Sequence, residues 1–255
     1  MGPTMRSTAY TLARHLDLFR SLPDAQVQDV LAQARVRTVD EGAPVFAQGA
    51  PALRFFLLVE GRLKVVQASS EGRQIIAHWI DPGQFFGLAV ALGRNDYPGT
   101  ALAATRSTIL AWPSASWAKL AALHPPLAEA ALRTLGGHLQ DAFARLREVA
   151  AMRVERRIAS ALLRLLRSSG QHTRAGLQIA FPITRQDIAE MAATTLYTVS
   201  RTFSSWENAG VLAVGRRRVV VVNPQMLMRL AGEERGEART SGSEACRGKR
   251  KVLHP

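Results

Sequence analysis

Cysteine is nearly absent from this chain, since Cys246 is the only one among its 255 residues. A single thiol cannot form an internal disulfide, and it cannot supply the several thiolates of a structural zinc site or an iron–sulfur cluster. Long apolar runs are also missing, because no stretch approaches the roughly 18 residues that a membrane-spanning helix requires. Residues 1–20 hold no apolar signal core, and Arg6 stands where N-myristoylation requires Ser or Thr. We therefore expect a protein of the reducing cytoplasm without a membrane partner.

Sequence motifs of the common enzyme classes are absent too. Residues 242–250 lack the spacing of a phosphate-binding loop and the Ser or Thr that follows its lysine. No GxSxG nucleophile elbow or HExxH zinc motif occurs, and no cysteine–histidine pair lies in a segment predicted to be ordered. The sequence therefore predicts a protein that is not an enzyme.

Positive charge is abundant and unevenly placed. The formal net charge is +13, and residues 153–229 hold twelve arginines, no lysine and only four acids. A further basic cluster follows near the C-terminus, at Arg247, Lys249, Arg250 and Lys251. A solvated surface is the simpler explanation of such charges, but their concentration in one region favours a nucleic acid as the partner.

A long amphipathic helix is predicted over residues 127–152, after Pro125 and Pro126, which suit a helix start. Six residues repeat at alternating intervals of three and four, the a/d spacing of a helix that packs against another helix. They are Leu132, Leu135, Leu139, Ala142, Leu146 and Val149. This seam favours self-association over packing within one chain, although the spacing does not itself identify the partner.

The segments on either side of this helix have different periodicities. Residues 10–35 have the spacing of short helices, and residues 36–120 alternate short apolar strands with glycine turns every ten to twelve residues. Strands are expected at Phe55–Val59, Leu63–Gln67 and Gln74–Ile80, which together predict a small β-sandwich or β-roll.

The C-terminal part begins with a predicted helix over Val154–Leu166. A polar loop should then extend to Gly176, followed by a short strand at Leu177–Phe181. From Arg229 onward little can be buried, so this tail is expected to be disordered.

Two helices and a tight turn are predicted within residues 183–208. Thr184 and Asp187 have the spacing of a capping box, in which Asp replaces the usual Glu or Gln. Residues 192–194 form the turn, and Thr195 caps a second helix that runs to about Asn208. Residues 211–222 form a hairpin wing with three arginines near its tip, Arg216, Arg217 and Arg218. An ordinary basic helical hairpin is the alternative, but the cap, turn and wing together indicate a DNA-binding helix-turn-helix.

The chain resembles the superfamily of the cyclic-AMP receptor protein and the oxygen-sensing fumarate–nitrate regulator. The resemblance covers roughly residues 16–228 and includes EGAPVFAQGAPALRFFLLVEGRLKVV, IDPGQFFG and ITRQDIAEMAATTLYTVSRTFSSWENAGVL. It implies an α+β fold with a cyclic-nucleotide-binding-like β-roll (10–124), a dimerisation helix (125–152), a winged helix-turn-helix (153–228) and a basic tail (229–255). It also implies a homodimer that binds near-palindromic double-stranded DNA and contacts RNA polymerase.

The same resemblance assigns roles to residues in the helix-turn-helix. The base-reading positions correspond to Leu196, Tyr197, Ser200 and Arg201. The phosphate-contacting positions correspond to Thr184, Arg185, Gln186 and Thr198, to which the wing adds Arg216, Arg217 and Arg218. Many family members have Glu at the position of Tyr197, so the half-site is least certain at that contact. The Ser200–Arg201 pair is typical of the fumarate–nitrate branch.

The β-roll over residues 10–124, called the sensor below, departs from the sequence pattern of cyclic-nucleotide binders. Residues 87–89, 98–101 and 142–143 stand where cyclic-nucleotide binders hold the ligand, but the phosphate's charged partner and the ribose-facing carboxylate are missing. An unpaired phosphate would be costly here, so we expect no cyclic AMP. We also expect no iron–sulfur cluster of the oxygen-sensing kind, because the sequence has no N-terminal cysteines. The effector pocket is predicted at Phe86, Gly87, Leu88, Thr100, Ala142 and Phe143.

Two stretches, beginning at Phe86 and Thr194, are most similar to the nitric-oxide-responsive regulators of denitrification. That resemblance implies haem as a cofactor, with His78 and His138 as candidate axial ligands. Ordinary hydrogen-bonded histidines are the alternative for both, and His15, His124, His172 and His254 are weaker candidates. A different branch with another small-molecule or redox effector stays open, as does a nucleotide-sensing module that does not bind DNA.

Overall fold

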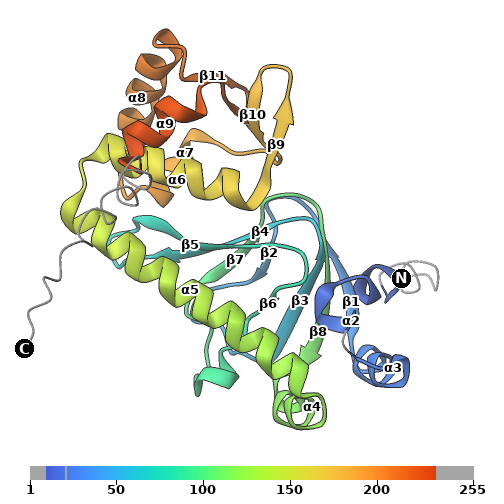
Figure 1. The fold of residues 1–255 in the computed structure, drawn as a ribbon. Helices are drawn as coiled ribbons and strands as arrows, with labels where there is room; N and C mark the ends of the chain where they lie inside the picture. The colour runs from blue at the N-terminus through green and yellow to red at the C-terminus, as the bar shows by residue number, and fades with distance from the viewer. Residues whose placement is uncertain (1–9, 21, 234–255) are drawn as a thin grey trace, which may run out of the picture.

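The structure, a computed structural model of the chain, describes residues 10–20 and 22–233. The chain forms a β-roll with flanking helices, one long helix, and a C-terminal winged helix-turn-helix module (Figure 1). This arrangement confirms the predicted α+β fold class and the predicted order of its parts. None of the helices in the described residues is both long and apolar enough to cross a membrane.

The β-roll consists of two four-stranded antiparallel sheets with the strand orders β1-β8-β3-β6 and β2-β7-β4-β5. Its strands are β1 (Arg35–Val39), β2 (Pro44–Phe46), β3 (Arg54–Glu60), β4 (Leu63–Ala68), β5 (Gln74–Ile80), β6 (Phe85–Phe86), β7 (Thr100–Ala103) and β8 (Ser107–Pro113). Phe56, Leu58 and Ile109 are buried in the core that the two sheets share. The strands predicted within residues 55–80 are therefore confirmed.

Alternate residues of β3 and β8 form a second core on the other face of their sheet. Phe55 stacks on Trp112 with ring centroids 5.3 Å apart, and the Trp112 indole N–H donates to the Val30 carbonyl over 2.9 Å. The helical segments that complete the sensor are α2 (Asp17–Arg20), α3 (Asp24–Ala32), η1 (Val90–Leu92), η2 (Ser114–Ser116) and α4 (Trp117–Leu123). Burial on both faces explains why β3 reads as a continuous apolar run.

The long helix α5 (Pro125–Ala151) contains 27 residues, or about 40 Å of rise. Leu127 and Ala131 in its first two turns are buried in the sensor's second core. Figure 1 shows the rest of α5 running past the β-roll toward the C-terminal module. The predicted helix is thus confirmed, and it begins at the proline pair.

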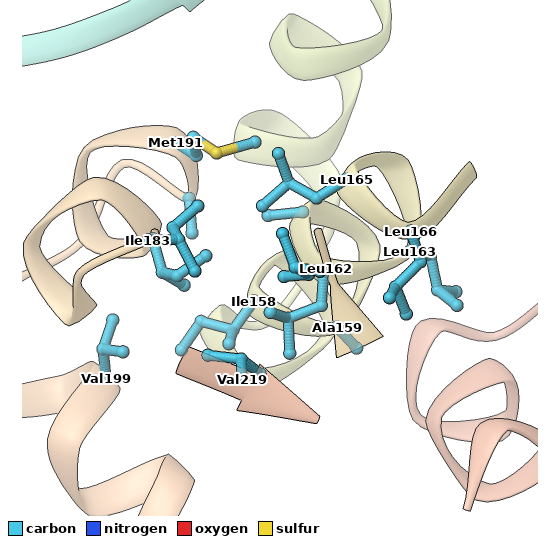
Figure 2. Packing of buried hydrophobic residues seen from close by; sticks show 14 of the residues in the cluster. Ile158, Ala159, Leu162, Leu163, Leu165, Leu166, Ile183, Met191, Val199 and Val219 are labelled. Carbon is cyan, nitrogen blue, oxygen red and sulfur yellow. The ribbon is translucent and has the colours of Figure 1, made fainter. Parts of the chain in front are cut away.

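The C-terminal module packs helices around a four-stranded sheet with the order β11-β12-β10-β9. Its elements are α6 (Val154–Ser169), β9 (Gly170–Thr173), β10 (Gly176–Ile179), α7 (Arg185–Met191), α8 (Leu196–Asn208), β11 (Leu212–Gly215), β12 (Arg218–Val221) and α9 (Pro224–Ala231). Figure 2 shows Ile158 and Leu162 of α6 pointing toward Ile183, Val199 and Val219. This core fixes how α7 and α8 are presented to a partner.

Three predictions for this module need correction. The segment before Gly176 is a strand, β9, because its backbone pairs with β10 in a hairpin. The strand predicted at Leu177–Phe181 ends at Ile179. The expected disorder from Arg229 onward is wrong at its start, because α9 continues to Ala231 and buries Leu227 and Ala231. Residues 234–255, with Cys246 and the last basic cluster, lie outside the described residues.

The C-terminal module docks on the β-roll rather than standing apart from it. Val66 of β4 and Ile76 of β5 belong to the same buried cluster as the core of the module. The buried Arg62 guanidinium donates to Ser169 Oγ over 2.9 Å and lies 4.0 Å from the ring centroid of Phe181. These contacts join segments more than a hundred residues apart in the sequence.

Candidate nucleic-acid interface and sensor cavity

The first helix of the helix-turn-helix is held at its start by a complete capping box. The Asp187 carboxylate accepts from the Thr184 backbone N–H over 2.8 Å, and the Thr184 hydroxyl accepts from the Asp187 N–H over 3.0 Å. Lys64 of β4 donates to the other oxygen of the same carboxylate. The predicted capping box is confirmed, and its acid also pairs with the sensor.

The turn between the two helices is stabilised by an arginine that the sequence pattern did not reveal. Ala193 adopts a left-handed φ of 48°, which is uncommon for a residue other than glycine. The Arg157 guanidinium of α6 donates to the carbonyls of Ala192 and Ala193 over 2.9 and 3.2 Å. Thr195 then caps α8 by accepting the Thr198 N–H over 3.2 Å, as predicted.

The recognition helix α8 has one buried face and one exposed face. Val199, Phe203 and Trp206 are buried, whereas three of the predicted base-reading residues are exposed and Ser200 is half-buried. The exposed ones are Leu196, Tyr197 and Arg201. Arg201 lies one turn from Tyr197, with its guanidinium 5.8 Å from the ring centroid. A cation–π contact therefore positions the arginine from which a guanine contact is expected.

The predicted phosphate contacts gather in one groove of about 570 Å³ between the start of α7, the start of α8 and the wing. Six of the seven line it together: Thr184, Arg185, Gln186, Arg216, Arg217 and Arg218. Thr198 instead lies along the other side of α8, in a shallow cleft with Tyr197 and Arg201. Four arginines, Arg185 and the three of the wing, beside the starts of two helices form a surface suited to a phosphate backbone.

One wing arginine already has an acidic partner. Arg217, at the tip of the hairpin with a positive φ of 56°, pairs with Glu41 of the β-roll over 2.5 Å. A DNA phosphate would compete with this carboxylate for the Arg217 guanidinium.

The predicted dimer seam is mostly solvent-exposed along α5 from Leu132 onward. Leu132, Leu139, Leu146 and Val149 have exposed fractions between 51% and 68%. Ala142 is exposed as well, whereas Leu135 is half-buried because it lines the sensor cavity. A row of large exposed apolar residues on one helix is typical of an interface.

The sensor contains a cavity of about 100 Å³ between the β-roll and α5. Phe86, Gly87 and Leu88 line it, as predicted by position, and Gly87 has a φ of +67° with Phe56 so close that a side chain would collide. None of the residues that line it is Lys, Arg, Asp or Glu. A cyclic phosphate would therefore find no charged partner there.

Three residues predicted for the effector pocket do not line this cavity. The Thr100 hydroxyl faces the β2–β3 connection, where it accepts the Gln48 N–H over 3.0 Å. Ala142, itself a seam residue, and its neighbour Phe143 are exposed on α5 and do not line the cavity. They are available to a second copy of the chain rather than to their own cavity.

His78 and His138, from β5 and α5, form one wall of the cavity. Their rings stack with centroids 3.7 Å apart and planes inclined by 19°. Burial, followed by His138 and Arg145, lowers the pKa of His78 to about 3. Burial also lowers the pKa of His138, with Asp141 opposing the shift. Both imidazoles are therefore neutral at neutral pH, and no group of three or more metal-binding side chains occurs in the described residues.

Comparisons with known proteins agree with both parts of the molecule. Residues 36–124 match the cyclic nucleotide-binding domain, and residues 156–230 match the Crp-like helix-turn-helix domain. The cyclic AMP receptor protein of Thermus thermophilus is 26% identical over 214 residues, which cover 84% of this chain and 96% of that protein. The global nitrogen regulator of Synechococcus elongatus is 27% identical over 214 residues, covering 83% and 94%.

Among solved structures, FixK2 from Bradyrhizobium japonicum has a TM-score of 0.67 at 25% identity, covering 77% of this chain and 96% of that chain. The relatives are regulators, which agrees with the absence of enzyme motifs. The same family is indicated by the order of the matched domains, by the exposed face of α8 and by the basic groove. The chain belongs to the CRP/FNR family of DNA-binding transcription regulators.

Proposed function

We propose that this protein is a homodimeric regulator that binds a near-palindromic operator under the control of an effector bound beside α5. Regulators of this family bind DNA as dimers. The observation that carries the proposal for this chain is the exposed apolar row on α5, which a second copy would bury. Two-fold symmetry then places the two α8 helices in successive major grooves, about 34 Å apart. A dimer bound in this way is also the form that would contact RNA polymerase.

A gel-shift titration against a selected operator pool tests this proposal directly. We expect the enriched sequences to contain inverted half-sites, and each operator to bind two chains when stoichiometry is measured by light scattering. Bound complexes of one chain, or enrichment of no sequence, would contradict it.

The effector is proposed to be something other than cyclic AMP. The cavity of about 100 Å³ is far smaller than the roughly 300–1,000 Å³ of typical ligand pockets. It also lacks the charged side chain that would balance a phosphate. Calorimetric titration with cyclic AMP should show no binding, and micromolar affinity would overturn this part.

Nitric oxide sensed through haem, with control of denitrification genes, is the effector assignment that the sequence resemblance suggests. The arrangement of His78 and His138 does not fit an enclosed haem, because two stacked rings leave no space for a macrocycle between them. The cavity that they border is also too small for one. A haem held between the two rings would require α5 and β5 to separate.

An absorption spectrum after haem addition, with and without nitric oxide, tests the haem assignment. A Soret band that responds to nitric oxide and is lost in His78→Ala or His138→Ala would support it. A spectrum that both variants leave unchanged would reject these two ligands.

A further inference from the structure

A second, wider cleft of about 530 Å³ lies on the other side of the two histidines, between β5, α5 and α6. It is the place where the sensor, the long helix and the DNA-binding module meet. Four arginines line it, against two acids. The arginines are Arg133, Arg145, Arg164 and Arg167, and the acids are Asp81 and Asp141.

Two of these guanidinium groups have buried N–H donors without a hydrogen-bond partner in the described part of the chain. Arg145 donates through both Nη atoms to the carbonyls of Ile76 and Ala77, but its Nε has no acceptor. Arg164 donates through Nη1 to Glu148, but its Nη2 has no acceptor. A buried donor without a partner is costly, and native structures rarely leave two in one place.

Arg145 is the cleft arginine without an ion pair in the described residues, because Arg133, Arg164 and Arg167 pair with Glu129, Glu148 and Glu233. Asp81 is engaged by Arg62, and Glu148 is engaged by Arg164 itself. Burial lowers the pKa of Arg145, and the charge of Arg164 lowers it further, while Asp141 and Glu148 oppose the shift. The two guanidinium groups therefore repel each other across the cleft.

We propose that this cleft binds a small oxyanion, such as a carboxylate or an inorganic oxyanion, with Arg145 and Arg164 as its principal donors. An anion with two oxygens would accept both orphaned N–H groups and reduce the repulsion between the two cations. Each guanidinium has one buried donor nitrogen left for the ligand, so the anion would be held between the two arginines by charge-assisted hydrogen bonds rather than by a fork on one of them.

The bound anion would connect β5 of the sensor with α6 of the DNA-binding module. If the proposed function holds, the anion is therefore an effector that changes how readily the module leaves the β-roll. Anion binding itself does not depend on that function, because it can be measured in the absence of DNA.

Thermal unfolding and calorimetric titration of the full chain test the site, with sodium succinate, phosphate and nitrate as separate probes and chloride at equal ionic strength as the reference. We expect saturable stabilisation by at least one probe, and the three probes distinguish a carboxylate ligand from an inorganic one. Stabilisation no greater than that of chloride for all three probes would overturn the proposal.

Arginine-to-lysine variants separate the site from general charge effects. Arg164→Lys keeps the charge and can keep the Glu148 pair, but it loses the forked donor, so the anion affinity should fall about tenfold or more. Arg147→Lys is the matched control on the exposed side of α5 and should bind like the parent. Equal affinity of these two variants would contradict the assignment. Arg145→Lys should also lower the anion affinity, and because Arg145 holds β5, its circular dichroism is compared with that of the parent. A parent-like spectrum with parent-like affinity would contradict the role of Arg145.

A gel shift with and without the anion keeps the two proposals apart. If the parent chain binds the anion but binds no operator with or without it, the proposed function is contradicted and the anion site is not.

Discussion

Arg201 and Tyr197 show how one residue contact can position a side chain that is proposed to read DNA. Tyr197 stands where many family members have Glu, and its ring lies beneath the Arg201 guanidinium. An aromatic ring cannot accept from a base as a carboxylate does, but it restricts where the arginine points. We therefore expect Tyr197 to affect operator binding by restricting the position of Arg201.

Replacing Arg201 with alanine should weaken specific operator binding by about 1–3 kcal/mol, because a bidentate contact to guanine would be lost. Fluorescence anisotropy with a labelled operator and a scrambled duplex measures the effect. Arg174→Ala removes the same charge from the exposed β9–β10 turn and serves as the control. Equal losses in the two variants would show that Arg201 contributes only charge.

If Arg217 contacts DNA as proposed, Glu41 competes for it, because the two side chains form an ion pair in the docked arrangement. Glu41→Gln should therefore raise DNA affinity by up to about fivefold at low salt, which is the size of an exposed ion pair. The gain should shrink at high salt, because the pair is solvent-exposed. Glu60→Gln, at the exposed end of β3, is the charge-matched control. Unchanged affinity in Glu41→Gln would mean that Arg217 does not contact the duplex.

At the scale of single elements, α5 carries the proposed self-association. Leu139→Asp would remove one apolar side chain per subunit at roughly 1.5–3 kcal/mol each and place two carboxylates in the interface. The dimer dissociation constant should rise by about 100-fold or more, as measured by sedimentation equilibrium. Leu123→Asp, equally exposed on α4 but away from the seam, should leave it unchanged. Dissociation in the Leu123 variant alone would exclude the seam.

The contact between β5 and α5 should make the fold sensitive to acid. The pKa of His78 is about 3 in the folded chain and about 6.5 in an unfolded one, so below pH 6.5 the unfolded chain binds an extra proton. The contribution of neutral His78 to the free energy of unfolding is therefore fully present above pH 6.5 and is lost as the pH decreases toward 3. At pH 5.5 this histidine alone should cost about 1 kcal/mol.

Urea unfolding at pH 7.5 and 5.5 measures this loss, and His78→Gln should show a smaller one. His172→Gln is the control, since His172 is exposed on β9. The same pH dependence in the His78 variant and the parent would show that other groups are responsible.

Local sequence patterns were enough for most elements but not for β9 and α9. The long helix, the capping box and the strands of the β-roll follow from spacing within one segment, so their prediction needed no tertiary information. β9 reads as a polar loop because its side chains are exposed, and only its pairing with β10 makes it a strand. α9 is short and is followed by a polar tail, so nothing in the sequence indicated that Leu227 and Ala231 would be buried.

At the scale of the whole molecule, the sequence could not reveal how the parts pack together. Arg62, Lys64 and Arg157 look like ordinary surface cations, because their partners lie far away in the chain. The residues proposed to contact DNA come from one continuous segment, so placing six of the seven phosphate-contact candidates in one groove needed no long-range contact. The cavity was predicted only in part, because Thr100, Ala142 and Phe143 were placed by position alone. The stacking of His78 on His138 likewise depends on how α5 crosses β5.

The carboxylate of Asp187 serves two domains at once, since it closes the first turn of α7 and accepts from Lys64. Fraying of that turn is therefore coupled to separation of the module from the sensor. Amide hydrogen exchange at the start of α7 would consequently report, without any label, how often the two domains come apart.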